Sequence, residues 1–123
     1  MRMWNVDPRI MCREHLAGSH LEIHMFLGSI AIGTSMRGFL DKNLLEPEYL
    51  KEYHDMIALE MISRGYKHQS DIPEEFFKTT ILKLSDSDRI VKIDKDEALK
   101  ELLSRCPECT ERYNELKVQD GKI

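Results

Sequence analysis

Apolar residues recur at helical spacing along most of this chain, and no pair of stretches shows the alternation that neighbouring strands require. Leu16, Ile23 and Leu27 form one apolar stripe, which predicts a first helix from about residue 11 into the low thirties. The same spacing predicts a second helix from about residue 46 to 64. We expect these two helices to pack against each other.

Two further helices are predicted in the second half of the chain. One passes through residues 76 to 81, with Asp71 and Glu74 as its capping pair, and breaks near Ser85, where short polar side chains compete for backbone hydrogen bonds. The other covers about residues 95 to 105 and is ended or kinked by Pro107.

Both ends of the chain differ from these helices. Residues 1–11 have no helical period, but they carry enough apolar side chains to be held on the body of the protein: Met3, Trp4, Val6, Ile10 and Met11. Residues 118–123 are expected to fray. The sequence therefore predicts an all-α fold, a compact single domain over residues 1–123 with about three to four helices and an ordered N-terminal tail.

Composition is that of a soluble globular protein, with 41% hydrophobic and 33% charged residues. The net charge of −4 gives no general reason to expect nucleic acid, so a DNA site would need a local basic patch. No apolar run reaches the roughly 18 residues of a membrane span, and no signal peptide is recognisable. We expect a cytoplasmic monomer that does not bind a membrane.

Ionisable residues are concentrated in residues 12–26, CREHLAGSHLEIHMF. On a helix, His15 and Glu22 fall within about 20° of each other, whereas His20 and His24 point away from Glu22. An i, i+4 pair of histidines can grip a metal, line a binding groove or be structural. A catalytic HExxH site needs its glutamate beside the first histidine, which this stretch does not offer.

The three cysteines are Cys12, Cys106 and Cys109, an odd number that argues against a disulfide framework. The CxxC spacing of Cys106 and Cys109 fits half of a zinc site, a redox pair or two ordinary thiols. A structural zinc needs four ligands, and no second such pair lies nearby in the sequence. No metal and no cofactor are therefore expected.

The N-terminal amine is a third source of chemistry. Its reference pKa of about 7.7–8.0 leaves part of it uncharged and nucleophilic near neutral pH. Such an amine can form an imine with a sugar carbon, and a carboxylate such as Glu22, with His15 on the same face, can stabilise the cation and move protons. Spacing alone does not distinguish this role from that of a solvated glutamate.

These residues resemble the pyrimidine dimer DNA glycosylases, the phage endonuclease V type that acts on ultraviolet damage. The resemblance is carried by Arg2, by His15-Leu16 followed seven residues later by Glu22, by MISRGYKH at residues 61–68 and by SDIPEEF at residues 70–76. It covers about the first 76 residues, and SDIPEEF is its most specific part.

The resemblance implies a helical DNA-repair enzyme, a glycosylase with abasic-site lyase activity on pyrimidine dimers or a related lesion. It implies that Met1 supplies the attacking amine, that Glu22 is the essential carboxylate and that Arg2 contacts DNA near the reacting sugar. His15 is expected in the same pocket. The bulky Arg2 should prevent removal of Met1.

Double-stranded DNA with damaged bases is the expected partner, in the nucleoid or in viral DNA. We expect His20 to contact it, while Leu21 and Met25 stand where the family has arginines. Other positive side chains are candidates for phosphate contacts: Arg13, Arg37, Lys42, Arg64 and Lys67. Two alternatives are a non-catalytic DNA-binding module of the same fold and a small metal-binding protein.

Overall fold

The computed structural model describes residues 1–68 and 70–120, and 68% of the described residues are helical. No strand occurs in these two ranges, which confirms the all-α prediction. The α-helices are α1 (Arg13–Ala31), α2 (Arg37–Asp41), α3 (Leu50–Ser63), α4 (Glu74–Ile81), α5 (Asp86–Arg89), α6 (Lys95–Arg105) and α7 (Pro107–Asp120). Two 3-10 turns, η1 (Pro8–Ile10) and η2 (Pro47–Tyr49), precede α1 and α3.

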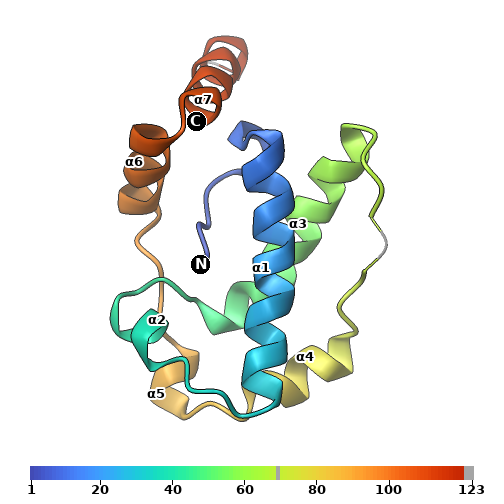
Figure 1. The fold of residues 1–123 in the computed structure, drawn as a ribbon, viewed down its shortest axis with the longest axis vertical. Helices are drawn as coiled ribbons and strands as arrows, with labels where there is room; N and C mark the ends of the chain where they lie inside the picture. The colour runs from blue at the N-terminus through green and yellow to red at the C-terminus, as the bar shows by residue number, and fades with distance from the viewer. Residues whose placement is uncertain (69, 121–123) are drawn as a thin grey trace.

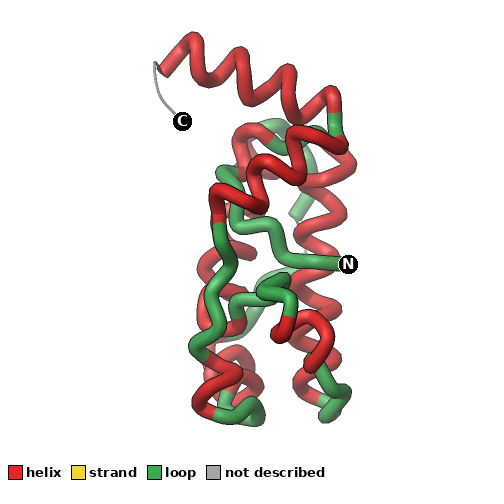
Figure 2. The backbone as a smooth tube through the Cα atoms, turned by 90° about the vertical axis from the view of Figure 1, so that its left-hand side faces the viewer, coloured by secondary structure: helices red, strands yellow, loops and turns green. Residues whose placement is uncertain are grey.

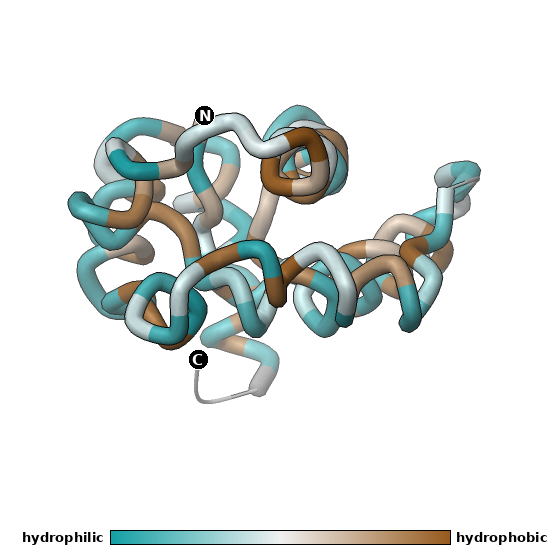
Figure 3. Tube along the Cα trace, turned by 90° about the horizontal axis from the view of Figure 1, so that it is seen from below, coloured by the Kyte–Doolittle hydropathy of each residue, from teal (hydrophilic) through white to brown (hydrophobic). Residues whose placement is uncertain are grey.

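Helices α1 and α3 pack side by side as the centre of the fold (Figure 1). Helix α4 packs against α1, while α6 and α7 form a second layer that contacts η1. The N-terminal tail lies between α6 and α1, and Figure 2 shows it in the space between the helices. Hydrophobic and hydrophilic stretches alternate along the chain, as Figure 3 shows, because each helix turns one side inward.

The seven α-helices of the described chain exceed the three to four that the sequence predicts. Helices α2 and α5 span only five and four residues, too short for a periodic pattern to reveal them. Helix α7 is a further helix: Pro107, which is predicted to end or kink the preceding helix, occupies the first position of α7, where proline is favoured. Residues 118–120 are helical and not frayed, and residues 121–123 lie outside the described chain.

The predicted capping pair of α4 is wrong. Pro73 occupies the N-cap position in an extended conformation, and no side chain caps this helix. The Asp71 carboxylate instead lies 3.7 Å from Nδ1 of His68. The Asp71 side chain therefore faces a histidine of the same loop and does not cap α4.

The N-terminal tail is held in place, as its apolar residues predict. Its five apolar side chains are all at least 95% buried: Met3, Trp4, Val6, Ile10 and Met11. The Met3 N–H donates to the Leu44 carbonyl over 2.8 Å, and the buried Tyr53 hydroxyl donates to the Val6 carbonyl over 2.6 Å. The Asn5 side chain donates to the buried Glu46 carboxylate over 3.0 Å. Backbone and side-chain bonds together therefore fix the path of the tail.

None of the described helices has the length and apolar content that a membrane crossing would need.

Candidate functional site

Glu22 lies beside the start of the chain. The backbone N–H of Arg2 donates to Oε2 of Glu22 over 2.9 Å, and both side chains are half-buried. The Met1 amine is three covalent bonds from the Arg2 nitrogen, so it lies within about 4 Å of that atom and about 7 Å of the carboxylate oxygen. Met1 is 48% exposed, so its amine borders on solvent while a carboxylate stands near it.

The Arg2 side chain turns inward over Trp4, with its guanidinium carbon 4.1 Å from the ring centroid. Its Nε is buried and has no hydrogen-bond acceptor among the described residues. Burial and the neighbouring Arg105 cation lower the pKa of Arg2, although Glu101 and Glu22 oppose this shift. A buried guanidinium N–H without an acceptor is costly, and the contact with the Trp4 ring offsets part of that cost.

A cavity of about 540 Å³ opens beside Arg2. Lys42 and Asn43 line one side, and Glu97 and Glu101 of α6 line another. Its carboxylates disfavour a phosphate but can accept hydrogen bonds from the amino groups of a base.

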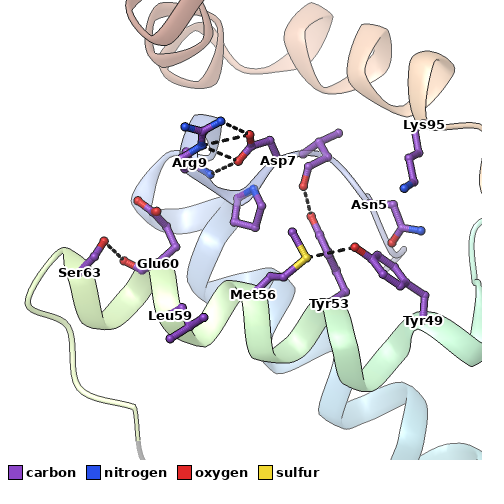
Figure 4. Close-up of a pocket in the computed structure, with 12 residues that line it drawn as sticks. Asn5, Asp7, Arg9, Tyr49, Tyr53, Met56, Leu59, Glu60, Ser63 and Lys95 are labelled. Carbon is purple, nitrogen blue, oxygen red and sulfur yellow. Dashed lines mark hydrogen bonds and ion pairs between the residues drawn. The ribbon is translucent and has the colours of Figure 1, made fainter. Parts of the chain in front are cut away.

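The cavity of about 640 Å³ in Figure 4 lies elsewhere, between η1 and α3. Tyr49, Tyr53 and Met56 line it, and neither Met1 nor Glu22 belongs to its wall. Burial raises the pKa of Tyr53, whose hydroxyl holds the tail there. We therefore assign this region to fixing the tail.

His15 faces three sulfur atoms, a group that we call the sulfur cluster (Cys12, His15, Cys106 and Cys109). Nδ1 of His15 lies 3.2 Å from Sγ of Cys12 and 3.7 Å from Sγ of Cys109. Burial raises the pKa of Cys12, and it raises that of Cys109 to about 12. Burial opposes ionisation of Cys106 too, but hydrogen bonds from the N–H and the thiol of Cys109 lower its pKa.

His20 belongs to a separate group on α1, α3 and the following loop, the imidazole cluster (His20, His24, His54 and His68). Nε2 of the fully buried His54 lies 3.1 Å from Nε2 of His20 and 3.4 Å from Nε2 of His68. His54 Nε2 also lies 3.0 Å from the Ser70 carbonyl oxygen. Burial, followed by the neighbouring imidazoles, lowers the pKa of His20 to about 4 and lowers that of His24.

The sequence pattern of the pyrimidine dimer DNA glycosylases matches residues 1–74, which is more than half of the chain. The chain belongs to this family. The matched segment contains the tail, α1 with Glu22, and α3, whereas Cys106 and Cys109 lie outside it. Searches of curated proteins and of solved structures gave no match. Membership in a family of DNA-repair glycosylases makes DNA the substrate class.

Among the DNA contacts predicted for this glycosylase, Arg2 is brought next to Glu22, whereas Arg13 and His20 contact other groups. Arg13 is exposed, and its guanidinium carbon lies 5.3 Å from the centroid of the Tyr66 ring. His15 contacts the sulfur cluster on one side and Trp4 on the other, with ring centroids 6.1 Å apart.

Two of the other predicted phosphate contacts are engaged by carboxylates. Arg37 pairs with Asp41 over 2.8 Å and with Asp88 over 3.0 Å. Arg64 pairs with Glu60 over 2.7 Å. Lys42 is exposed at the 540 Å³ cavity, and Lys67 is exposed in the loop after α3.

Several residues that organise these sites were not singled out by the sequence analysis. His54 and His68 join His20, and buried Glu46 accepts bonds from the Asn5 side chain and from the Ile93 N–H. A polar residue at an apolar position of a helix could have flagged His54, which lies between buried Tyr53 and Ile57 on α3. The grouping of His15 with Cys106 and Cys109 depends on long-range packing, which no local pattern shows.

Proposed function

We propose that the protein excises pyrimidine dimers or a related base lesion from double-stranded DNA and then cleaves the strand at the abasic site, through an imine formed by the Met1 amine. The observation that carries this proposal is the hydrogen bond from the Arg2 N–H to Glu22, because it keeps a carboxylate close to the amine. Family membership supports the glycosylase step.

In the first step the uncharged amine attacks C1′ of the damaged nucleotide. The glycosidic bond breaks and its electron pair leaves with the base. The nitrogen then loses a proton, the C1′–O4′ bond of the sugar ring breaks, O4′ keeps the electron pair of that bond and takes up the proton, and the nitrogen lone pair forms the C1′–nitrogen double bond of a protonated imine. Glu22 stabilises the positive charge that develops at C1′ and on the nitrogen, and it accepts or relays the proton.

In the second step the protonated imine draws electrons from the sugar. A proton leaves C2′, the C3′–O bond breaks, and the phosphate departs with the electron pair of that bond. Water finally hydrolyses the imine and restores the free amine. No metal or redox partner is required to balance either step.

Arg2 is assigned to a phosphate oxygen next to the reacting sugar, because a guanidinium donates well to phosphate and the bond from the Arg2 N–H to Glu22 holds this residue beside the amine. The stacked Trp4 and the His15 behind it position that guanidinium. The neighbouring cavity of about 540 Å³ is suited to a base displaced from the stack, which must leave to expose C1′.

Helix α1 offers apolar contacts beside Glu22. Leu21 is 59% exposed and Met25 is 48% exposed, and both flank Glu22 on the helix surface. Such side chains can pack against unstacked bases at a lesion. Arg13 and His20 are assigned to more distant contacts with the DNA backbone.

The proposal is tested by borohydride trapping on duplexes that carry a cyclobutane dimer or an abasic site. Protein whose free Met1 amine is verified by mass spectrometry should form a covalent adduct. A version with an N-terminal extension should form none, because its nucleophile is displaced. Folded protein that traps on neither duplex, or an adduct that survives the extension, would overturn the imine mechanism.

Glu22→Gln provides the second test, because glutamine still accepts the Arg2 N–H bond but carries no negative charge. We expect strand cleavage to fall by about 10²- to 10⁴-fold with little change in the unfolding temperature. Glu14→Gln is the matched control, since Glu14 is exposed on the same helix. DNA binding without any dependence of cleavage on Glu22 or on the terminus would favour a non-catalytic binding module.

A further inference from the structure

The sulfur cluster joins two short motifs that are 94 residues apart. Cys12 and His15 form a CxxH pair at the start of α1, and Cys106 and Cys109 form a CxxC pair at the start of α7. One ligand atom from each of the four residues lies within 4.8 Å of all the others. The CxxC pair, which has no second pair nearby in the sequence, therefore has the CxxH pair as its partner in the folded chain.

The distances within the cluster match those of ligands around one tetrahedral ion. Two thiolates bound to zinc at about 2.3 Å lie about 3.8 Å apart, and a thiolate and an imidazole nitrogen lie about 3.6 Å apart. The sulfur atoms of Cys106 and Cys12 are 3.8 Å apart. Nδ1 of His15 lies 3.2 Å and 3.7 Å from the sulfurs of Cys12 and Cys109.

Backbone donors point at the sulfur atoms. The His15 N–H donates to Cys12 over 3.4 Å, the Cys109 N–H to Cys106 over 3.4 Å, and the Cys12 N–H to Cys109 over 3.2 Å. In addition, the N-terminal ends of α1 and α7 both adjoin the cluster, and helix N-termini stabilise negative charge. Burial alone favours protonated thiols, and these donors offset part of its cost once a metal ion takes the place of the protons, because cysteine binds a metal as the thiolate.

We propose that Cys12, His15, Cys106 and Cys109 bind one Zn²⁺ ion in a closed structural site. Three thiolates and one imidazole are a common ligand set of structural zinc, and four protein ligands leave no open position. The three cysteines are at least 92% buried, so solvent has little access to the bound ion.

The zinc ion fastens the C-terminal helices to the part of the molecule that carries the active site. Cys106 follows α6 and precedes α7, so the ion fixes the junction of these helices against the start of α1. The His15 ring packs edge-on against Trp4, and Trp4 lies under both Arg2 and Arg105. The zinc site thus supports the wall behind Arg2 and does not depend on the imine chemistry.

The imidazole cluster is a competing candidate for a metal site among the described residues, and its contacts argue against metal binding there. Nε2 of His54 faces the Ser70 carbonyl and Nδ1 of the same ring faces the Asp55 carboxylate, and both of these partners can only accept a hydrogen bond. A protonated nitrogen has no lone pair for a metal. The two clusters also differ in chemistry, since only the first contains sulfur.

Metal content and cobalt spectroscopy separate these two sites. Protein produced with zinc and passed over a desalting column should contain one zinc per chain by elemental mass spectrometry. Replacement of zinc by Co²⁺ should give thiolate-to-cobalt charge-transfer absorption in the near ultraviolet and intense tetrahedral bands in the visible. All three cysteines of the chain belong to the cluster, so every such band reports on it.

Three variants complete the test. Cys109→Ser should lose the zinc and the charge-transfer bands, whereas the control His20→Gln should keep both. His15→Cys should retain one zinc with stronger charge transfer, because it exchanges one zinc ligand for another. If Cys109→Ser fails to fold, the unaltered protein and His15→Cys still decide the question.

Several results would overturn the proposal. They are folded protein with three free thiols that takes up no zinc, a disulfide between two of the cysteines in protein prepared under reducing conditions, and a cobalt complex without sulfur charge transfer. Zinc content that is unchanged in Cys109→Ser and halved in His20→Gln would place the metal in the imidazole cluster instead.

Discussion

The sulfur cluster and the imidazole cluster both include residues of α1 and residues from distant parts of the chain. They differ in the backbone groups that face them. Three N–H groups face the sulfur atoms, whereas a carbonyl oxygen faces His54. Donors stabilise negative ligands, and an acceptor stabilises a ring that keeps its proton. The same helix therefore presents a group prepared for a cation and a group of packed imidazoles that face hydrogen-bond acceptors.

This difference shows that ligand-type residues in proximity do not define a metal site by themselves. Their protonation is set by the polar groups that surround them, as in any buried polar network. The pKa of His20, lowered by burial to about 4, belongs to a ring kept neutral by its surroundings. Measurements that perturb the two clusters separately should therefore give different responses.

Removal of zinc should have the largest effect. When free zinc exceeds its dissociation constant about a thousandfold, binding adds about 4 kcal/mol to the free energy of unfolding. A strong chelator should therefore lower stability by about that amount in urea unfolding, and addition of zinc should restore it. Limited proteolysis should then cut first near the junction of α6 and α7, because the ion holds that junction.

The control for this experiment is the response of His20→Gln, which should lose as much stability to the chelator as the unaltered protein. If the chelator does not shift the urea unfolding transition of the unaltered protein, the sulfur cluster holds no stabilising zinc, and the proposed difference between the two clusters is wrong.

The long helices could be predicted from the sequence because their signals are local. The stripe of Leu16, Ile23 and Leu27 is buried, and α6 covers the predicted residues 95 to 105. Helix α7 has few apolar positions, so its place is set by contacts with η1 and α6 and not by its own periodicity. The family resemblance predicts that Glu22 acts beside the Met1 amine. The structure shows the Arg2 N–H donating to Glu22, and the catalytic role of Glu22 stays a prediction.

The clusters could not be predicted in the same way. No further cysteine or histidine adjoins Cys106 and Cys109 in the sequence, because the missing half lies 94 residues earlier, at the start of α1. His20 and His24 were considered as an i, i+4 metal pair, and their rings do lie 4.8 Å apart. The spacing of this pair does not reveal His54 and His68, because His54 Nε2 meets the ring nitrogens of His20 on α1 and of His68 in the loop before α4. Such partners depend on tertiary packing alone.

The imidazole cluster should respond to loss of packing and not to loss of metal. His54→Ala removes a fully buried ring and leaves the Ser70 carbonyl without that donor, so we expect a loss of about 2 to 4 kcal/mol in urea unfolding. His24→Leu is the matched control. The buried Nε2 of His24 has no partner among the described residues, so an apolar replacement should cost less than about 1 kcal/mol. Equal losses in the two variants would refute the assigned role of the His54 hydrogen bonds.

Acid should produce the smallest effect. Burial and the rings of His54, His24 and His68 lower the pKa of His20 to about 4, below the ordinary value of 6.5. The unfolded chain therefore binds a proton that the folded chain refuses, and stability is complete above pH 6.5 and falls as the pH drops towards 4.

Because the His20 ring is partly solvated, we expect its share of this loss to be about 1 kcal/mol or less at pH 5. His20→Gln should flatten the dependence of the unfolding free energy on pH between 6.5 and 5, when both proteins are compared with zinc bound. The carboxylates at the edge of the cluster, Asp55 and Asp71, are present in both proteins and cancel in the comparison. An unchanged slope in His20→Gln would show that this imidazole already accepts a proton in the folded state, and the contrast with the sulfur cluster would then rest on geometry alone.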